Sequence, residues 1–194
     1  LGATALDTSV LRGRTMINID SDDEGVFTVG CAGGMRSDLS LPIERSGCIL
    51  QAYEIVISGL AGGHSGAEID KGRANATKLM GEFLSSLSGI RICDLHGGKA
   101  DNAIPRECVA VVCAAADPSG AAADFLAAMR ERYGDIEPDM KITVRETAAS
   151  LPLTAESTGR AIKLITSVPD GVIAMSTDIP GLVQTSLNLG ITET

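Results

Sequence analysis

The stretch Ile49-Leu-Gln-Ala-Tyr-Glu-Ile-Val-Ile-Ser58 decides the fold, because most of its apolar side chains recur at every second position. Glu54 falls on the opposite side from its neighbours Tyr53 and Ile55, since successive residues of an extended chain face opposite ways. One face of the segment carries four apolar side chains: Ile49, Tyr53, Ile55 and Ile57. This pattern predicts a β-strand with one buried face.

A helix is predicted after this strand, over Lys71–Leu87, with Asp70 as its N-cap. Its apolar residues recur at intervals of three or four and form one stripe: Ala76, Leu79, Met80, Phe83, Leu84 and Leu87. Further strands are expected at 90–95, 107–116 and 140–147, and further helices at 118–133 and 154–168. The order from about Leu50 to Thr147 is β-α-β-β-α-β, which predicts an α+β fold: a ferredoxin-like antiparallel sheet with helices on one face.

Composition and charge argue against several classes of function. The 194 residues include 16 Lys and Arg against 25 Asp and Glu, a formal net charge of −9. Nucleic acids and anionic membranes bind clustered basic residues, so neither is an expected partner. No apolar run approaches the roughly 20 residues that span a bilayer. The five cysteines form no C-x-x-C pair, which favours reduced, buried thiols in a cytosolic protein. Because Leu1 is not an initiator Met, we expect a piece of a longer protein.

An acidic turn, Asp20-Ser-Asp-Asp-Glu-Gly25, follows a predicted buried strand at Thr15–Ile19. It is no EF-hand, because the twelfth position is Cys31, where that loop needs a bidentate Glu. Asp20 nevertheless ends its strand, a position where metal ligands collect. The turn is therefore either the site of one metal ligand or merely a solvated acidic loop.

Two other segments carry candidate chemistry. The glycines of Gly62-Gly-His-Ser-Gly66 let the backbone bend freely, so that His64 could donate a proton or hydrogen bond to a developing oxyanion. A flexible loop with a solvated imidazole is the alternative. In Asp101-Asn-Ala-Ile-Pro-Arg106, Asn102 could simply cap a turn, and Arg106 could bind a carboxylate or remain solvated.

These motifs occur together, in this order, in one family, and the chain resembles the aminoacyl-histidine dipeptidases. These are cytosolic bacterial metallopeptidases that cleave Xaa-His dipeptides such as carnosine. The matching segments are Ile17-Asn-Ile-Asp-Ser-Asp-Asp-Glu-Gly25, Gly30-Cys-Ala-Gly-Gly34, Gly59-Leu-Ala-Gly-Gly-His-Ser-Gly66, Gly72-Arg-Ala-Asn-Ala76, Asn102-Ala-Ile-Pro-Arg-Glu107 and Ser176–Gly190.

The resemblance implies a lid and dimerisation domain over 42–167, flanked by catalytic-domain segments at 1–41 and 168–194. The intact enzyme would be a cytoplasmic homodimer that holds two zinc ions and a dipeptide substrate. By resemblance, Asp20 is a metal ligand, and His64 reaches across the dimer to stabilise the oxyanion in the partner's active site. Asn102 and Arg106 are implied to bind the substrate.

Several family motifs have no counterpart in the sequence: the His-x-Asp ligands, the bridging Asp, the Glu-Glu pair and the final His. We therefore expect this chain alone to be inactive and to bind zinc weakly or not at all. Several relatives also carry an Arg where this chain has Cys113-Ala-Ala-Ala116, which leaves the anchor of the substrate carboxylate open. Two alternatives remain: a dimerising α+β interaction module without catalysis, or the lid of a related aminoacylase or tripeptidase.

Overall fold

The structure is a computed structural model that describes residues 6–15, 17, 24–26, 30, 32–148 and 150–194. The chain divides into two compact units, Leu1–Ser37 and Asp38–Thr194. The first unit includes a short 3-10 helix, η1 (Thr8–Val10), whose N-cap Asp7 accepts a hydrogen bond from the backbone N–H of Ser9. Most of the strand expected at 15–19, and Asp20 itself, lie outside the described residues.

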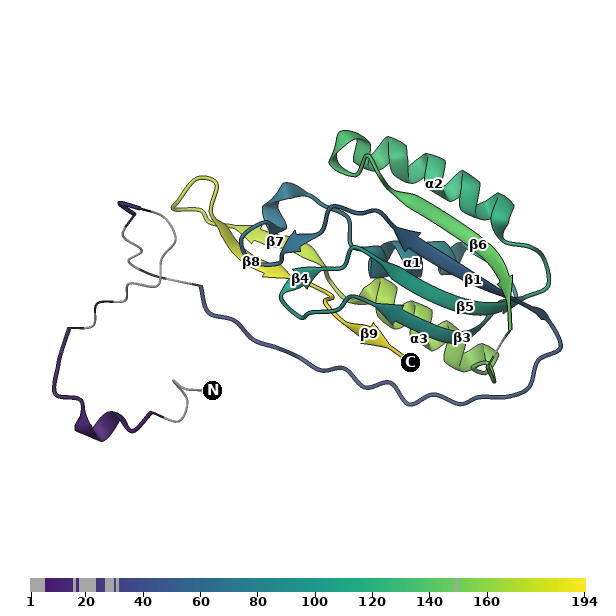
Figure 1. The fold of residues 1–194 in the computed structure, drawn as a ribbon, viewed down its shortest axis with the longest axis horizontal. Helices are drawn as coiled ribbons and strands as arrows, with labels where there is room; N and C mark the ends of the chain where they lie inside the picture. The colour runs from purple at the N-terminus through teal and green to yellow at the C-terminus, as the bar shows by residue number, and fades with distance from the viewer. Residues whose placement is uncertain (1–5, 16, 18–23, 27–29, 31, 149) are drawn as a thin grey trace. The chain divides into compact units, whose positions relative to one another are not determined.

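The second unit is built on a five-stranded antiparallel sheet with the order β6-β1-β5-β3-β9 (Figure 1). Its strands are β1 (Gln51–Ser58), β3 (Arg91–Gly97), β5 (Cys108–Ala114), β6 (Lys141–Thr147) and β9 (Thr192–Glu193). The part of this order that reads β6-β1-β5-β3 is that of a ferredoxin-like fold. In that fold the first and third strands of the motif, here β1 and β5, lie at the centre. The predicted fold class is therefore confirmed.

Three helices cover one face of this sheet: α1 (Ala76–Ser86), α2 (Ser119–Tyr133) and α3 (Ala155–Ser167). The apolar face of β1 and the apolar stripe of α1 meet in one buried cluster, which also contains Val112 of β5. The rings of Phe83 and Phe125 join α1 to α2, with their centroids 5.3 Å apart. Burial of this shared apolar surface is the main favourable contribution to folding.

Two local predictions differ from the structure. Helix α1 begins at Ala76 rather than near Lys71, and its N-cap is Asn75 rather than Asp70. Asp70 lies in a separate 3-10 turn, η2 (Ile69–Lys71), which Gly72 ends in a left-handed conformation with φ 66°. Ile49 was expected on the buried face of β1, but it is fully exposed because the strand begins only at Gln51.

The amide of Asn75 has a second role beside capping. Its oxygen accepts the N–H groups of Thr77 and Lys78, at 3.0 and 3.3 Å, which caps α1. Its nitrogen donates to Asp170 Oδ1 at 2.8 Å and to the carbonyl of Leu189 at 3.1 Å. This buried side chain therefore joins the start of α1 to two segments near the C-terminal end of the chain.

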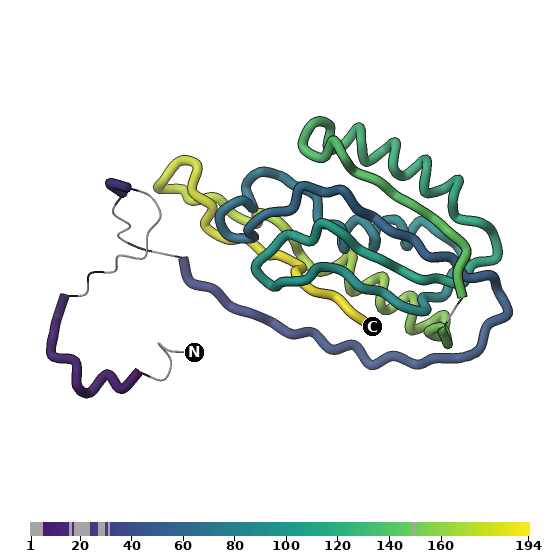
Figure 2. The backbone as a smooth tube through the Cα atoms, in the orientation of Figure 1, coloured from purple at the N-terminus to yellow at the C-terminus, as the bar shows by residue number. Residues whose placement is uncertain are grey.

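Two smaller ribbons complete the second unit. One pairs β2 (Gly63–His64) with β4 (Ala103–Ile104), and the other pairs β7 (Gly171–Met175) with β8 (Val183–Leu187). Residues 38–50 run in an extended conformation along the domain, as the tube in Figure 2 shows. No helix in the described part of the chain is both long enough and apolar enough to cross a membrane.

The contact between α1 and α3 depends on a glycine. Gly81 is buried in α1, and a Cβ atom placed there would lie 2.6 Å from Ile165 Cγ2 of α3. Gly159 lies on the exposed side of α3, and a Cβ atom there would meet nothing within 4 Å. Gly81 and Gly159 therefore differ in packing while sharing the same intrinsic cost in a helix.

We predict that Gly81→Ala lowers the free energy of unfolding by about 1–3 kcal/mol, because overpacking outweighs the gain in helix propensity. Gly159→Ala should raise it by up to about 1 kcal/mol, because only the propensity changes. Urea unfolding of both variants beside the wild type measures the difference. A more stable Gly81→Ala variant would show that α1 and α3 are not in close contact.

Candidate functional site

The ribbon of β2 and β4 brings together two of the residues singled out by their motifs. His64 pairs with Ala103 across the ribbon, and Gly63 pairs with Ile104. The backbone N–H of Ser65 donates to the carbonyl oxygen of Asn102 at 2.9 Å. His64 and Asn102 are both exposed. The sheet pairing thus places an imidazole and a carboxamide from distant parts of the sequence on one small exposed ribbon.

The hydrogen bonds of the His64 ring define its tautomer. The ring Nδ1 accepts the backbone N–H groups of Gly66 at 3.0 Å and Ala67 at 3.1 Å. A nitrogen that accepts hydrogen bonds carries no proton, so the proton of the neutral ring lies on Nε2. His64 is therefore held as a hydrogen-bond donor through Nε2, which suits it to bind an oxygen acceptor.

A group of paired charges supports the backbone of this loop. Glu68 accepts the N–H of His64 at 2.9 Å and also binds Lys71 Nζ at 2.7 Å and Arg73 Nη2 at 3.2 Å. The hydrogen bond from Lys71 is the largest of the interactions that lower the pKa of Glu68 to about 2. Arg73 also donates to the carbonyl of Gly62. These side chains therefore pair with one another and bind the backbone of the loop, while His64 is exposed.

Arg106 lies against the same loop from the other side. Its Nε donates to the carbonyl of Leu60 at 3.0 Å. A Cβ atom at Gly62, where φ is 63°, would lie 2.2 Å from Arg106 Cγ, so only glycine admits the arginine stem here. Within the described residues, the terminal guanidinium nitrogens of Arg106 have no hydrogen-bond or ion-pair partner. His64, Asn102 and Arg106 thus converge on one loop and ribbon.

Asn188 belongs to the same site but was not predicted. Its Nδ2 donates to the carbonyl of Asp101 at 3.2 Å and to that of Ala103 at 2.9 Å, the two residues that flank Asn102. Asn188 thereby fixes the backbone on both sides of the exposed carboxamide. These two bonds join Asn188 to residues that lie 87 and 85 positions earlier in the sequence. No local pattern in the sequence indicates them.

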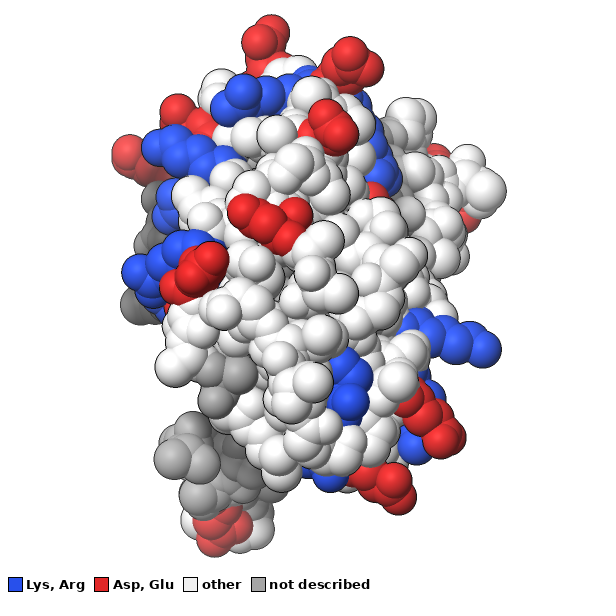
Figure 3. Space-filling model, turned by 90° about the vertical axis from the view of Figure 1, so that its right-hand side faces the viewer, with Lys and Arg blue, Asp and Glu red and all other residues white. Residues whose placement is uncertain are grey.

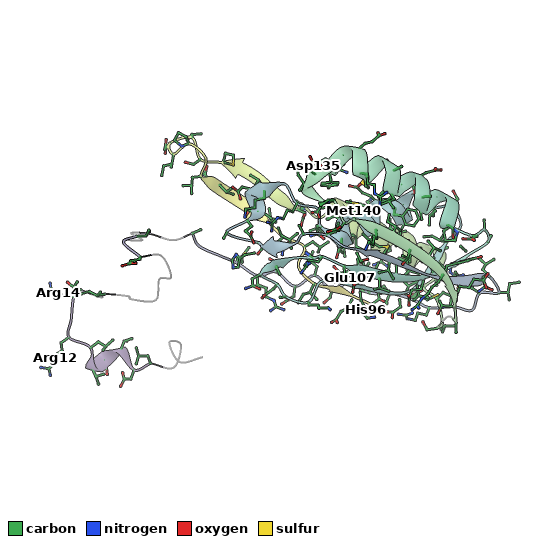
Figure 4. The ribbon with its side chains drawn as sticks, turned by 45° about the horizontal axis from the view of Figure 1, so that its top comes forward. Arg12, Arg14, His96, Glu107, Asp135 and Met140 are labelled. Carbon is green, nitrogen blue, oxygen red and sulfur yellow. The ribbon has the colours of Figure 1, made fainter. Side chains whose placement is uncertain are left out.

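The second histidine of the chain, His96, lies outside this site. It belongs to β3 in the five-stranded sheet, where its Nε2 is 2.9 Å from Asp94 Oδ2. Figure 4 shows His96 and Glu107 on the side of the domain away from α2. His96 is therefore an exposed imidazole with a carboxylate partner, and its surroundings differ from those of His64.

The described residues do not form a zinc centre. They contain no group of three or more His, Cys, Asp or Glu side chains that could hold a metal ion, and Asp20 lies outside them. The Nδ1 atom of His64 is already bonded to two backbone N–H groups. The donor set that is described therefore fits hydrogen bonding to a substrate better than metal ligation.

Charges of both signs are mixed on the surface that Figure 3 draws. Lys and Arg side chains lie beside Asp and Glu side chains, mostly toward the margin, and uncharged side chains fill the centre. This face carries no continuous basic surface of the kind that binds a phosphate backbone.

Comparisons with known proteins relate this chain to peptidases. The family model of the peptidase dimerisation domain matches residues 55–141. The cytosol non-specific dipeptidase of Escherichia coli (strain K12) is 35% identical over 98% of this chain. The crystal structure of aminoacylhistidine dipeptidase from Vibrio alginolyticus matches 79% of this chain with a TM-score of 0.75 and 32% identity.

The chain spans only part of these relatives. It covers 41% of the length of the Escherichia coli dipeptidase and 34% of the Vibrio alginolyticus chain. The family model covers the second half of β1, the loop with His64, α1, Asn102, Arg106 and α2. Residues 55–141 therefore match the peptidase dimerisation domain family, within a chain that is similar to a dipeptidase over nearly its whole length.

Proposed function

We propose that this chain is the lid and dimerisation part of a metal-dependent cytoplasmic dipeptidase that hydrolyses Xaa-His dipeptides. The lid would extend over 42–167, and the segments 1–41 and 168–194 would belong to the catalytic domain. The match to a peptidase dimerisation domain supports a homodimer, and the names of both relatives support a dipeptide substrate.

The observation that carries the catalytic proposal is the hydrogen-bonded state of the His64 ring. Hydrolysis of a peptide bond places negative charge on the carbonyl oxygen, and a fixed N–H donor stabilises that charge most when it needs no reorganisation. The two backbone bonds to Nδ1 hold the ring in the donor tautomer before substrate arrives. We propose that Nε2 of His64 donates to this oxyanion in the active site of the partner subunit.

The neighbouring residues suit the rest of a dipeptide. The Asn102 carboxamide is exposed on the same ribbon and can donate a second hydrogen bond to the oxyanion or to the substrate. The guanidinium of Arg106 presents planar donors that match a carboxylate, which supports a contact with the C-terminal carboxylate of the dipeptide.

We also propose Asp20 as one ligand of a centre with two zinc ions, whose other ligands lie in the rest of the dipeptidase. Zinc at such a centre supplies an activated water at neutral pH. The described residues contribute substrate binding and oxyanion stabilisation, so the isolated chain is expected to hydrolyse no dipeptide.

In the dipeptidase, His64→Ala should lower kcat by about 10²–10³-fold, because one donor to the oxyanion is lost. The KM for L-carnosine should change little, since the contact forms mainly in the transition state. The matched control is His96→Ala, which removes the other imidazole and should retain kcat. Steady-state kinetics with L-carnosine measure both variants, and wild-type turnover by His64→Ala would contradict the proposed role.

The action of His64 across the dimer has its own test, which combines two inactive protomers. A His64→Ala protomer retains Asp20, and an Asp20→Ala protomer retains His64. If His64 acts on the partner's site, a mixed dimer contains one complete active site, and a statistical mixture should recover about a quarter of wild-type activity. Co-expression with two affinity tags isolates the mixed dimer. No recovery in that dimer would mean that His64 acts within its own subunit.

A further inference from the structure

A single buried carboxylate lies behind the loop that carries His64. Among the described residues, Glu137 is the only Asp, Glu, Lys or Arg that is buried, with 2% of its surface exposed. It follows the 3-10 helix η3 (Gly134–Ile136), which continues from the C-terminal end of α2. Figure 4 labels Asp135 and Met140 on either side of it in the sequence, and Met140 is likewise buried.

Both oxygens of Glu137 accept backbone hydrogen bonds from distant segments. The N–H of Ala61 donates to Oε2 at 2.7 Å, and the N–H of Ala74 donates to Oε1 at 2.8 Å. Two acceptor oxygens are the bonding pattern of an ionised carboxyl group. A charge removed from water is costly, and these charge-assisted bonds offset that cost only while both donors stay in place.

The two donors bracket the segment that contains His64. Ala61 lies three residues before the histidine, in the glycine-rich loop. Ala74 adjoins Arg73, whose guanidinium binds the carbonyl of Gly62 and the carboxylate of Glu68. Glu68 in turn accepts the N–H of His64. Glu137 therefore bonds directly to both ends of the segment 61–74. Arg73 and Glu68 then connect the second end to the backbone of His64.

A close backbone approach holds Glu137 against this loop. Gly59 has φ 79°, and a Cβ atom there would lie 2.1 Å from the carbonyl oxygen of Asp139. The loop after β1 and the turn before β6 are thus in direct contact. Rotation of the loop away from Glu137 would break this contact as well as the two hydrogen bonds.

We propose that Glu137 is a positioning residue for His64: its buried carboxylate sets the loop conformation in which Gly66 and Ala67 bond to the imidazole and hold its donor tautomer. The link to catalysis rests on the proposed function of His64 as an oxyanion donor. The effect of Glu137 on the imidazole does not rest on that function, and it can be measured in this chain without substrate.

The first test compares Glu137→Gln with the wild type by imidazole ¹H–¹⁵N spectroscopy of the 194-residue chain. Glutamine keeps the shape but sets an NH₂ group against one backbone donor, so that one of the two bonds is lost. We expect the Nδ1 and Nε2 shifts of His64 to move toward those of a free imidazole that exchanges between tautomers, while His96 is unchanged in the same spectrum.

The control is Gly81→Ala, which should cost similar stability at the contact between α1 and α3, far along the sequence from Glu137. It should leave the His64 signals as in the wild type. Unchanged His64 signals in Glu137→Gln, or equal changes in Gly81→Ala, would overturn the proposal. If Glu137→Gln does not fold, Glu137→Asp keeps the charge but shortens the side chain by one methylene, and the same shifts are expected in it.

The second test measures kcat in the dipeptidase. Glu137→Gln should lower kcat at least about tenfold with a smaller change in KM, because a misplaced donor weakens mainly the transition state. The double variant with His64→Ala should be no slower than His64→Ala alone. A further loss in the double variant would show that Glu137 acts through another group and would overturn the proposal. Full activity of His64→Ala, with the spectroscopic change intact, would reject the proposed function and leave the positioning of the imidazole supported.

Discussion

The pairing of β1 with β6 is the constraint on which the site depends. Ser58, the last residue of β1, pairs with Lys141, the first residue of β6. The chain that leaves β1 must therefore meet the turn that enters β6. This register brings the glycine-rich loop against the segment 137–140, where Gly59 packs on Asp139 and Ala61 bonds to Glu137. The loop that carries His64 is thus anchored by the edge of the sheet, although it belongs to no strand of that sheet.

The site contains three charged side chains that are paired and two neutral polar side chains that are exposed. Lys71 and Arg73 both pair with Glu68. Glu68 and Arg73 also bind the backbone of the loop. The imidazole of His64 and the carboxamide of Asn102 are left exposed. A neutral donor can stabilise developing negative charge without first losing a strong ionic partner.

Local patterns predicted those parts of the structure that depend on local interactions. Alternation identified β1, and the apolar stripe identified α1, because each reflects burial of one face. The start of α1 was misplaced because Asn75 is a better-placed cap than Asp70 once Gly72 turns the chain. The motifs singled out His64, Asn102 and Arg106, and the structure brings these three residues to one loop and ribbon. Glu137 and Asn188 were not predictable, because their partners lie more than 60 residues away in the sequence.

The side chain of Asn75 caps α1 and also contacts the C-terminal part of the chain, and the second contact requires an amide. Aspartate would cap α1 as well as asparagine does, since either offers an oxygen to the first N–H groups of the helix. Only the amide can also donate to Asp170, where a second carboxylate would repel the first. The choice between these two nearly isosteric residues is therefore made by the C-terminal connection rather than by the helix. Deamidation of Asn75 to aspartate, as occurs in protein ageing, would leave the helix capped. It would remove the hydrogen bonds from Asn75 to Asp170 and Leu189 and so weaken the contact between α1 and the C-terminal segments.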